Sequence, residues 1–453
     1  MSLLFKGGCV ISPTESKYVD IRVENGKIAE IGENLSANGC EVIDADGYLI
    51  FPGFIDGHTH LDMDTSTAHT ADNFETGTRG AIAGGTTCII DFATQDRGSS
   101  LQNGLDSWHK LAQGNCSCDY AFHMAITDWN KDVEKEIPEM TKQGIKSYKI
   151  YMAYDALRLK DADIFEIMRC LKKEGAMLGC HCENGDLVDE LIAKEKSEGR
   201  MSPSSHPVSR PDKVESEAVN RFLTIARLCE LPVNIVHLSS EASMEVVRKA
   251  RGEGQKVFVE TCPQYLIFDD SKYRLDDFES AKYVCSPPLR PLGNQGMLWQ
   301  AVENHEVNTI STDHCSFNFD GQKTLGKDDF SKIPNGLPGV EHRPRLIYTY
   351  GVEENRISPN DMAALLSENI AKQFGLFPQK GALLVGSDAD IVLWDPKQEN
   401  VISAKNQEQN VDYTPYEGIK TVGMPHQVYL RGELVAEDGR AFDGKNGIFV
   451  KSV

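Results

Sequence analysis

Eight short apolar runs alternate with helical patterns through the middle of this 453-residue chain. The segments between the runs carry apolar residues at intervals of three and four, as at 163–173, 214–228 and 242–251. Eight strands alternating with helices are typical of a (β/α)8 TIM barrel, which places its chemistry where the strands end. The expected strands span residues 54–60, 86–93, 120–127, 147–153, 176–182, 233–238, 257–261 and 307–312.

A doubly wound sheet is the alternative α/β fold for such an alternation. That fold needs a glycine-rich phosphate-binding turn after the first strand. Here the corresponding position holds His58-Thr59-His60, so the barrel is favoured. A final helix is expected to begin at Ser358-Pro359, a capping residue followed by proline in the first turn, and to end before Gly375.

Both ends of the chain have the pattern of short antiparallel strands. Near the N-terminus Asn25-Gly26 separates two alternating runs, which predicts a hairpin, and similar runs return at 389–394 and 428–435. The simplest arrangement is a β-sandwich domain built from residues 1–51 and 376–453, the latter with a C-terminal tail. The (β/α)8 catalytic domain, residues 52–375, would be inserted between these two segments.

Charge and cysteine content narrow the class of protein. A formal net charge of −21 repels nucleic acid and anionic membrane surfaces, so neither is an expected partner and a small-molecule substrate is favoured. No apolar run approaches the ~18 residues of a membrane span, and the first residues are too short in apolar content for a signal peptide. The 12 cysteines form no Cys-x2-Cys pair, and we expect them to be reduced and mostly buried. These features indicate a cytoplasmic protein.

Polar side chains stand at the same end of several expected strands. In a strand, residues two apart share a face, so His58 and His60 point the same way, and imidazole is the commonest metal-ligating side chain. A lone histidine in a strand is more often a hydrogen-bonded core residue, and a strand-end aspartate often caps a helix. Several together at one end of a barrel predict a metal centre, formed by His58, His60, His181, His237 and Asp313.

Lys149 indicates that the centre holds two metals. An apolar strand is a costly place for an ammonium group, and a desolvated amine is nucleophilic. Capture of carbon dioxide would turn it into a carbamate, in effect a long carboxylate that can bridge two divalent ions. Two ions about 3.5–4 Å apart can share a hydroxide. Nitrogen and oxygen donors favour zinc, with manganese, cobalt or iron left open.

The order of the motifs resembles that of the dihydropyrimidinase and D-hydantoinase family of cyclic amidohydrolases. The resemblance implies a barrel with a β-sandwich, a binuclear zinc centre bridged by N6-carboxylated lysine, and a homotetramer. The implied reaction is hydrolytic opening of a cyclic diamide, a dihydropyrimidine or 5-substituted hydantoin, to an N-carbamoyl amino acid. The similar motifs extend over nearly the whole chain and lie at 58–63, 149–154, 181–185, 260–266, 285–290, 333–336 and 386–390.

The same resemblance implies a role for each matching position. His58, His60 and Asp313 would hold the more buried metal, His181 and His237 the more exposed one, and Lys149 would bridge them. Asp313 would also carry the proton from the attacking water to the leaving nitrogen. Tyr154 would bind the substrate and stabilise the developing oxyanion. Ser286 and Asn335 would bind the ring through their backbone groups.

Two signals on the ring substituent conflict. The loop 61–74 is polar, which favours a small or polar substituent as in dihydrouracil. The segment 335–341, in contrast, resembles the phenylhydantoinase branch of the family. The substrate therefore stays open within the class.

Other proteins built on the same barrel are alternatives. Dihydroorotases and allantoinases share it, but dihydroorotases usually have an arginine two positions after the second histidine, where this chain has Asp62. A carboxylate there would repel an anionic substrate. A non-catalytic scaffold protein related to dihydropyrimidinase would have lost metal ligands, whereas all six ligand positions are retained here.

Overall fold

The central feature of the fold is a barrel of eight parallel strands. The computed structural model describes residues 2–65 and 67–453. Neighbouring strands follow one another in chain order, and a bridge between Thr59 and His314 joins the two ends of the sheet. The (β/α)8 prediction is confirmed. The strands are β8 (Phe54–Thr59), β9 (Thr86–Thr94), β10 (Asp119–Ala125), β11 (Ser147–Tyr151), β12 (Met177–His181), β13 (Val233–Ile235), β14 (Val257–Thr261) and β15 (Thr309–Ile310).

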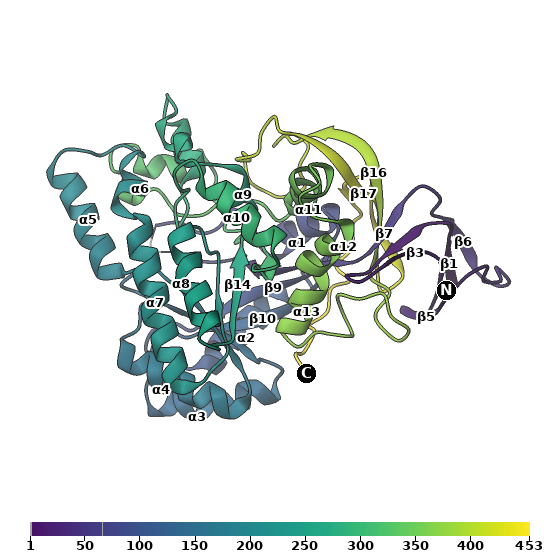
Figure 1. The fold of residues 1–453 in the computed structure, drawn as a ribbon, viewed down its shortest axis with the longest axis horizontal. Coiled ribbons are helices and arrows are strands. Elements are labelled where there is room, and N and C mark those ends of the chain that lie inside the picture. Colours follow the sequence, from purple (N-terminus) through teal and green to yellow (C-terminus); the bar gives the residue numbers. More distant parts are fainter. Residues whose placement is uncertain (1, 66) are drawn as a thin grey trace.

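Helices cover the outside of this barrel (Figure 1). The longer ones lie in the connections between consecutive strands and turn their apolar stripes toward the barrel. The longer helices are α1 (Phe74–Ala83), α2 (Leu101–Ala112), α3 (Lys131–Lys142), α4 (Asp161–Glu174), α5 (Gly185–Ser197), α7 (Asp212–Cys229), α8 (Glu241–Gly252) and α10 (Asn294–Glu303). The short ones are α6 (Ser205–Ser209), α9 (Pro263–Ile267), α11 (Arg343–Ile347), η1 (Asp270–Arg274), η2 (Glu279–Tyr283), η3 (Lys323–Gly326), η4 (Phe330–Lys332) and η5 (Tyr348–Glu353). Of these, η3, η4, α11 and η5 follow the last barrel strand.

The last helical segment begins and ends where the sequence predicts. It consists of α12 (Pro359–Ala363), the π-helical turn η6 (Ala364–Glu368) and α13 (Asn369–Gln373). Ser358 and Asp361 form a reciprocal capping box at its start, and Gly375 follows its end with a φ of +74°. The π turn was not expected, because a spacing of three and four apolar residues does not reveal one extra residue in a turn.

Strands from both chain ends form two further sheets, which lie side by side with the barrel in Figure 1. The Asn25-Gly26 hairpin is confirmed, with φ of +52° and +77°. One sheet has the order β5-β4-β1-β6 and the other β19-β18-β17-β16-β7-β2-β3. Their strands are β1 (Ser2–Lys6), β2 (Cys9–Ile11), β3 (Ser16–Tyr18), β4 (Asp20–Glu24), β5 (Lys27–Gly32), β6 (Glu41–Asp44), β7 (Leu49–Pro52), β16 (Ile391–Val401), β17 (Lys420–Leu430), β18 (Glu433–Glu437) and β19 (Arg440–Ala441).

These two sheets share one apolar core. The rings of Phe5 and Tyr429, one from each sheet, meet edge to face with centroids 4.9 Å apart, and Ile21 and Ile391 belong to the same cluster. The β-sandwich built from both termini is therefore confirmed as part of the fold. The domain limits, 1–51 and 376–453 around 52–375, stay a prediction. The C-terminal tail returns to the barrel, where the Val450 amide donates to the Tyr120 carbonyl at 2.8 Å.

The cysteines are as expected. All 12 lie in the described part of the chain and none forms a disulfide, and ten of them are buried. Within residues 2–65 and 67–453, no helix combines the length and the apolar character needed to cross a membrane.

Candidate metal centre

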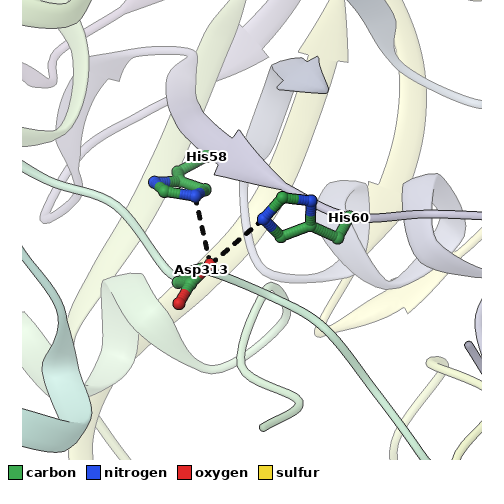
Figure 2. A group of neighbouring side chains, drawn as sticks. All are labelled: His58, His60 and Asp313. Carbon is green, nitrogen blue, oxygen red and sulfur yellow. Dashed lines mark ion pairs between the residues drawn. The ribbon is translucent and has the colours of Figure 1, made fainter. Parts of the chain in front are cut away.

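The first histidine pair meets an aspartate from the other edge of the barrel sheet. His58 lies in β8 and His60 directly after it, while Asp313 follows β15. The Nε2 atoms of His58 and His60 lie 3.1 Å and 3.3 Å from Asp313 Oδ1. Figure 2 shows both rings turned toward this carboxylate. The three side chains can each offer one ligand atom to a common metal ion.

A second carboxylate fixes which nitrogen of His58 is available. Glu260 Oε1, at the end of β14, lies 2.6 Å from His58 Nδ1. Because an ionised carboxylate only accepts hydrogen bonds, Nδ1 must donate, and the neutral ring then presents the lone pair of Nε2 to Asp313. A neutral His58 and the Asp313 carboxylate thus turn lone pairs toward each other at 3.1 Å, an arrangement that a metal ion, or a proton on Nε2, satisfies. This donor set fits a metal ion.

The charged groups around His58 and His60 favour a bound cation. Burial and Lys149 lower the pKa of His58, but Glu260 and Asp313 outweigh them and raise it above its ordinary value. Burial lowers the pKa of His60 to about 3, so this ring is neutral and its nitrogen is free to bind a metal. The carboxylates thus stabilise positive charge at the point where the imidazole nitrogens converge.

Lys149 lies at the centre of the cluster. Its side chain points inward from β11, is 2% exposed, and places Nζ 2.8 Å from His58 Nε2. The Phe92 ring covers the amine at 4.3 Å from its centroid. Burial lowers the pKa of Lys149 below its ordinary value, which favours the neutral, nucleophilic amine.

The second histidine pair also turns one ring nitrogen of each residue toward the other. His181 Nδ1 and His237 Nε2 are 3.0 Å apart, and His181 Nε2 is 2.8 Å from Glu183 Oε2. Glu183 accepts from Nε2, so a neutral His181 turns a lone pair toward His237. Burial lowers the pKa of His237 well below its usual range, and its Nδ1 atom is buried without a hydrogen-bond partner among the described residues. Both rings are suited to a second cation.

The two pairs form one site. The rings of His58 and His237 have centroids 5.6 Å apart, and Glu260 accepts both from His58 Nδ1 and from the His237 amide at 3.1 Å. The structure therefore brings together all six side chains that the sequence singled out: His58, His60, Lys149, His181, His237 and Asp313. Their roles as metal ligands stay predictions.

Tyr154 borders the second pair. Its ring centroid lies 5.3 Å from that of His181, and its backbone has a φ of +68°. The guanidinium of Arg210, paired with Glu183 at 2.7 Å, sits 5.4 Å from the Tyr154 ring centroid. Burial raises the pKa of Tyr154 and outweighs the lowering by Arg210, Ser286 and Asn335, so the phenol keeps its proton and can donate it in a hydrogen bond.

Ser286 and Asn335 leave their peptide groups unpaired. Among the described residues, no partner bonds to the backbone N–H or C=O of either residue. Unpaired backbone groups are uncommon unless a ligand or water satisfies them. Both residues lie close enough to Tyr154 to lower the pKa of its phenol. They are therefore candidates for binding the amide groups of a ring.

Comparison with known proteins identifies the family. Residues 49–435 match the amidohydrolase family. The chain belongs to this family. A D-hydantoinase from Geobacillus stearothermophilus is 43% identical over 449 residues, 99% of this chain and 95% of that protein. A D-phenylhydantoinase from Escherichia coli is 38% identical over 450 residues, 99% of this chain and 97% of that protein.

Solved structures agree with these relatives. A dihydropyrimidinase from Brevibacillus agri NCHU1002 is 41% identical and superposes with a TM-score of 0.98, covering 100% of this chain and 99% of that one. An L-hydantoinase from Arthrobacter aurescens is 28% identical, with a TM-score of 0.90 over 99% of both chains. These matches confirm the expected family and enzyme class. They do not favour the dihydroorotase, allantoinase or scaffold alternatives.

The polar loop of this amidohydrolase contains Asp62, whose carboxylate is expected from the sequence to repel an anionic substrate. Asp62 Oδ2 accepts from the Phe74 amide at 2.8 Å, at the first residue of α1. The partial positive charge of a helix N-terminus offsets part of the negative charge of this carboxylate, which weakens the repulsion expected from the sequence. Ser66, in the same loop, lies outside the described residues.

Sequence reasoning missed the residues that orient the site of this amidohydrolase. Glu260 orients His58, Glu183 orients His181, and Phe92 covers Lys149. Glu260 had one visible signal, since a carboxylate in an apolar strand needs a partner. Nothing in the pattern of β9 distinguishes Phe92 from an ordinary core residue.

We expect Glu260→Gln to weaken metal binding by about 10–100-fold, the usual effect of removing a carboxylate that orients a metal-bound histidine. Titration of metal-free protein with zinc, followed by calorimetry, measures this change. Glu245→Gln, an exposed position on α8, removes the same charge and should bind zinc like the wild type. Equal zinc affinity in Glu260→Gln and the wild type contradicts the orienting role.

Proposed function

We propose that this amidohydrolase opens the ring of a cyclic diamide by hydrolysis. The substrate is a dihydropyrimidine or a 5-substituted hydantoin, and the product is an N-carbamoyl amino acid. The observation that carries the proposal is the convergence of His58, His60 and Asp313, together with the neighbouring His181–His237 pair. The unpaired peptide groups of Ser286 and Asn335 beside Tyr154 support it. Relatives at 38–43% identity over nearly the full chain are named hydantoinases, which supports the same class.

The proposed cofactor is a pair of divalent ions, with zinc favoured by the nitrogen and oxygen donors. Such ions would acidify a water molecule and polarise the ring carbonyl. His58, His60 and Asp313 would hold one ion, and His181 and His237 the other. Lys149, whose Nζ lies 2.8 Å from His58 Nε2, would bridge the two ions in carboxylated form.

Carboxylation of Lys149 is a simple addition. The lone pair of Nζ forms a bond to the carbon of carbon dioxide, one carbon–oxygen π bond becomes a lone pair on oxygen, and one N–H proton leaves. Burial favours the neutral amine that this step requires. The resulting carbamate carries the negative charge that two neighbouring cations need. Phe92 packs over the amine and limits its exchange with water.

The protein side chains would divide the reaction between them. Asp313 stays ionised, since the neighbouring histidines lower its pKa more strongly than burial raises it, so it can accept a proton and return it to the leaving nitrogen. The Tyr154 phenol would donate to the oxygen that gains negative charge. Backbone groups of Ser286 and Asn335 would pair with the ring amide and hold its carbonyl near the site.

We expect Tyr154→Phe to lower kcat by about 10²–10³-fold, the cost of removing one donor to a developing oxyanion. The phenyl ring keeps the contacts with His181 and Arg210, so metal content and folding should stay unchanged. Steady-state kinetics with metal analysis measures the effect. A wild-type kcat in Tyr154→Phe would show that the Tyr154 hydroxyl takes no part.

Ring-opening assays test the proposed function directly. Metal-loaded protein is incubated with dihydrouracil, unsubstituted hydantoin and 5-phenylhydantoin, and the N-carbamoyl products are quantified. We expect turnover of at least one ring, loss of turnover after chelation, and recovery with zinc. A protein that carries two ions per chain and opens none of the three rings would overturn the proposal. The ranking of the three substrates also resolves the conflict between the polar loop and the 335–341 segment.

The assembly and location of the protein are part of the same proposal. The family resemblance supports a homotetramer, and the free, mostly buried cysteines are consistent with the reducing cytoplasm. Light scattering of the metal-loaded protein measures the number of chains. A mass of one chain, 50.2 kDa, would contradict the tetramer.

A further inference from the structure

A fully buried lysine lies beneath the two segments that carry the unpaired peptide groups. Lys323, the first residue of η3, has no exposed surface. Its Nζ donates to the carbonyl oxygens of Val284, Pro334 and Gly336 at 2.8, 2.7 and 2.8 Å. These three bonds use the full donor capacity of an ammonium group.

The three carbonyls belong to the segments of Ser286 and Asn335. Pro334 and Gly336 flank Asn335, and Val284 lies two residues before Ser286. The Val284 carbonyl also accepts from the Gly336 amide at 3.1 Å, so the two segments are joined directly as well as through Lys323. The lysine therefore ties together two stretches that are about fifty residues apart in the chain.

Lys323 bonds to peptide groups next to Ser286 and Asn335 but not to those of the two residues themselves. The carbonyls on either side of Asn335 and the one just before Cys285 are held by Lys323, whereas the backbone groups of Ser286 and Asn335 bond to none of the described residues. His206 adds a further anchor, with Nε2 2.8 Å from the Cys285 carbonyl. Unpaired donors and acceptors held at a fixed spacing are preorganised for a rigid polar ligand.

We propose that Lys323 is a positioning residue that sets the spacing between the peptide groups of Ser286 and Asn335 and thereby the affinity for the cyclic amide. This inference rests on the proposed function, because it takes these peptide groups to be the ring-binding groups. Lys323 does not touch the metal-ligand cluster in any hydrogen bond of the described residues. Its effect should therefore fall on binding of the ring and leave metal content unchanged.

The charge of the lysine explains why the anchor is strong. An ammonium group buried without partners would be costly, and the three carbonyl dipoles compensate it. Burial lowers the pKa of Lys323 to about 7. The neutral amine still has two N–H donors, so two of the three carbonyls remain bonded in that form. An apolar side chain of similar length would leave the Pro334 and Gly336 carbonyls unpaired, while the Val284 carbonyl would keep only the Gly336 amide.

Kinetics of Lys323→Met and Lys323→Gln test the inference. Methionine removes every donor, while glutamine keeps an amide with two. We expect KM for the best ring substrate to rise about tenfold or more in Lys323→Met, which corresponds to about 1.4 kcal/mol, and less in Lys323→Gln. We expect kcat to change less than about threefold and metal content to equal that of the wild type, since the anchor acts on ring binding.

Controls separate this role from a merely structural one. Lys327→Met removes an exposed lysine four residues further along and should keep the wild-type KM. A wild-type KM in folded Lys323→Met, or equal losses of kcat and metal in both Lys323 variants, would overturn the inference. If Lys323→Met does not fold, Lys323→Gln decides, and its wild-type KM would count against the role. Failure of the wild type to open any ring refutes the proposed function instead.

Discussion

Lys149→Ala is expected to prevent binding of the proposed metal pair and to lower kcat/KM by at least about 10⁴-fold, as when one member of a cooperating catalytic unit is lost. The reason is geometric. Lys149 Nζ lies 2.8 Å from His58 Nε2 and is covered by Phe92. No other side chain of β11 could carry a negative charge that bridges two ions. Without Lys149, Asp313 alone would supply negative charge to the two proposed cations, and their repulsion would expel at least one.

A small molecule should restore part of what Lys149→Ala loses. Alanine leaves a cavity shaped like a lysine side chain, and a short carboxylic acid such as acetate or propionate can place its carboxylate where the carbamate would lie. We expect metal content and turnover to rise together with acid concentration. Metal analysis and ring-opening assays measure both, with Lys142→Ala, an exposed position on α3, as the control for loss of a lysine. Full activity of Lys149→Ala without added acid would exclude the bridge.

Asp313→Asn is expected to lower kcat by about 10²–10⁴-fold, the usual contribution of a positioned proton-transfer group. An amide has nearly the same shape as the carboxylate, so the backbone at φ +54° and the barrel should be retained. The amide oxygen can still face the nitrogens of His58 and His60, but it cannot accept and return a proton at neutral pH. The loss should therefore appear in turnover more than in folding.

Three measurements distinguish the explanations for Asp313. Circular dichroism reports the fold, metal analysis reports the ligand role, and kcat reports the proton-transfer role. Asp320→Asn, an exposed position seven residues later, controls for the charge change and should behave as the wild type. If kcat of Asp313→Asn falls only in proportion to its metal content, Asp313 is a ligand without a part in proton transfer.

Much of the fold was predictable because its signals are local. The runs that become β8 to β15, the Asn25-Gly26 hairpin and the Ser358 cap depend on residues close together in sequence. The sandwich needed one further step, the inference that similar strand patterns at both ends pair. The π-helical turn at Ala364–Glu368 escaped prediction, since its single extra residue leaves the apolar spacing almost unchanged.

The site was predictable to the extent that barrel strands end at one face. That rule alone gathers His58, His181, His237 and Asp313. It says nothing about which nitrogen of each ring is free. That depends on Glu260, which contacts His58 from β14, and on Glu183, which follows His181 by two residues. Lys323 was invisible for a different reason: its partners are carbonyl oxygens, which every residue has, so the sequence carries no mark of the contact.

The seam where β8 meets the end of β15 has a consequence for stability. The His60 amide donates to the His314 carbonyl at 2.7 Å there, and His58 and His60 approach from one side while Asp313 approaches from the other. An ion bound between them would cross-link the first and last strands of the barrel, β8 and β15. Because an ion that binds only the folded form stabilises it by mass action, the concentration of the divalent metal would set the stability of the barrel as well as its turnover.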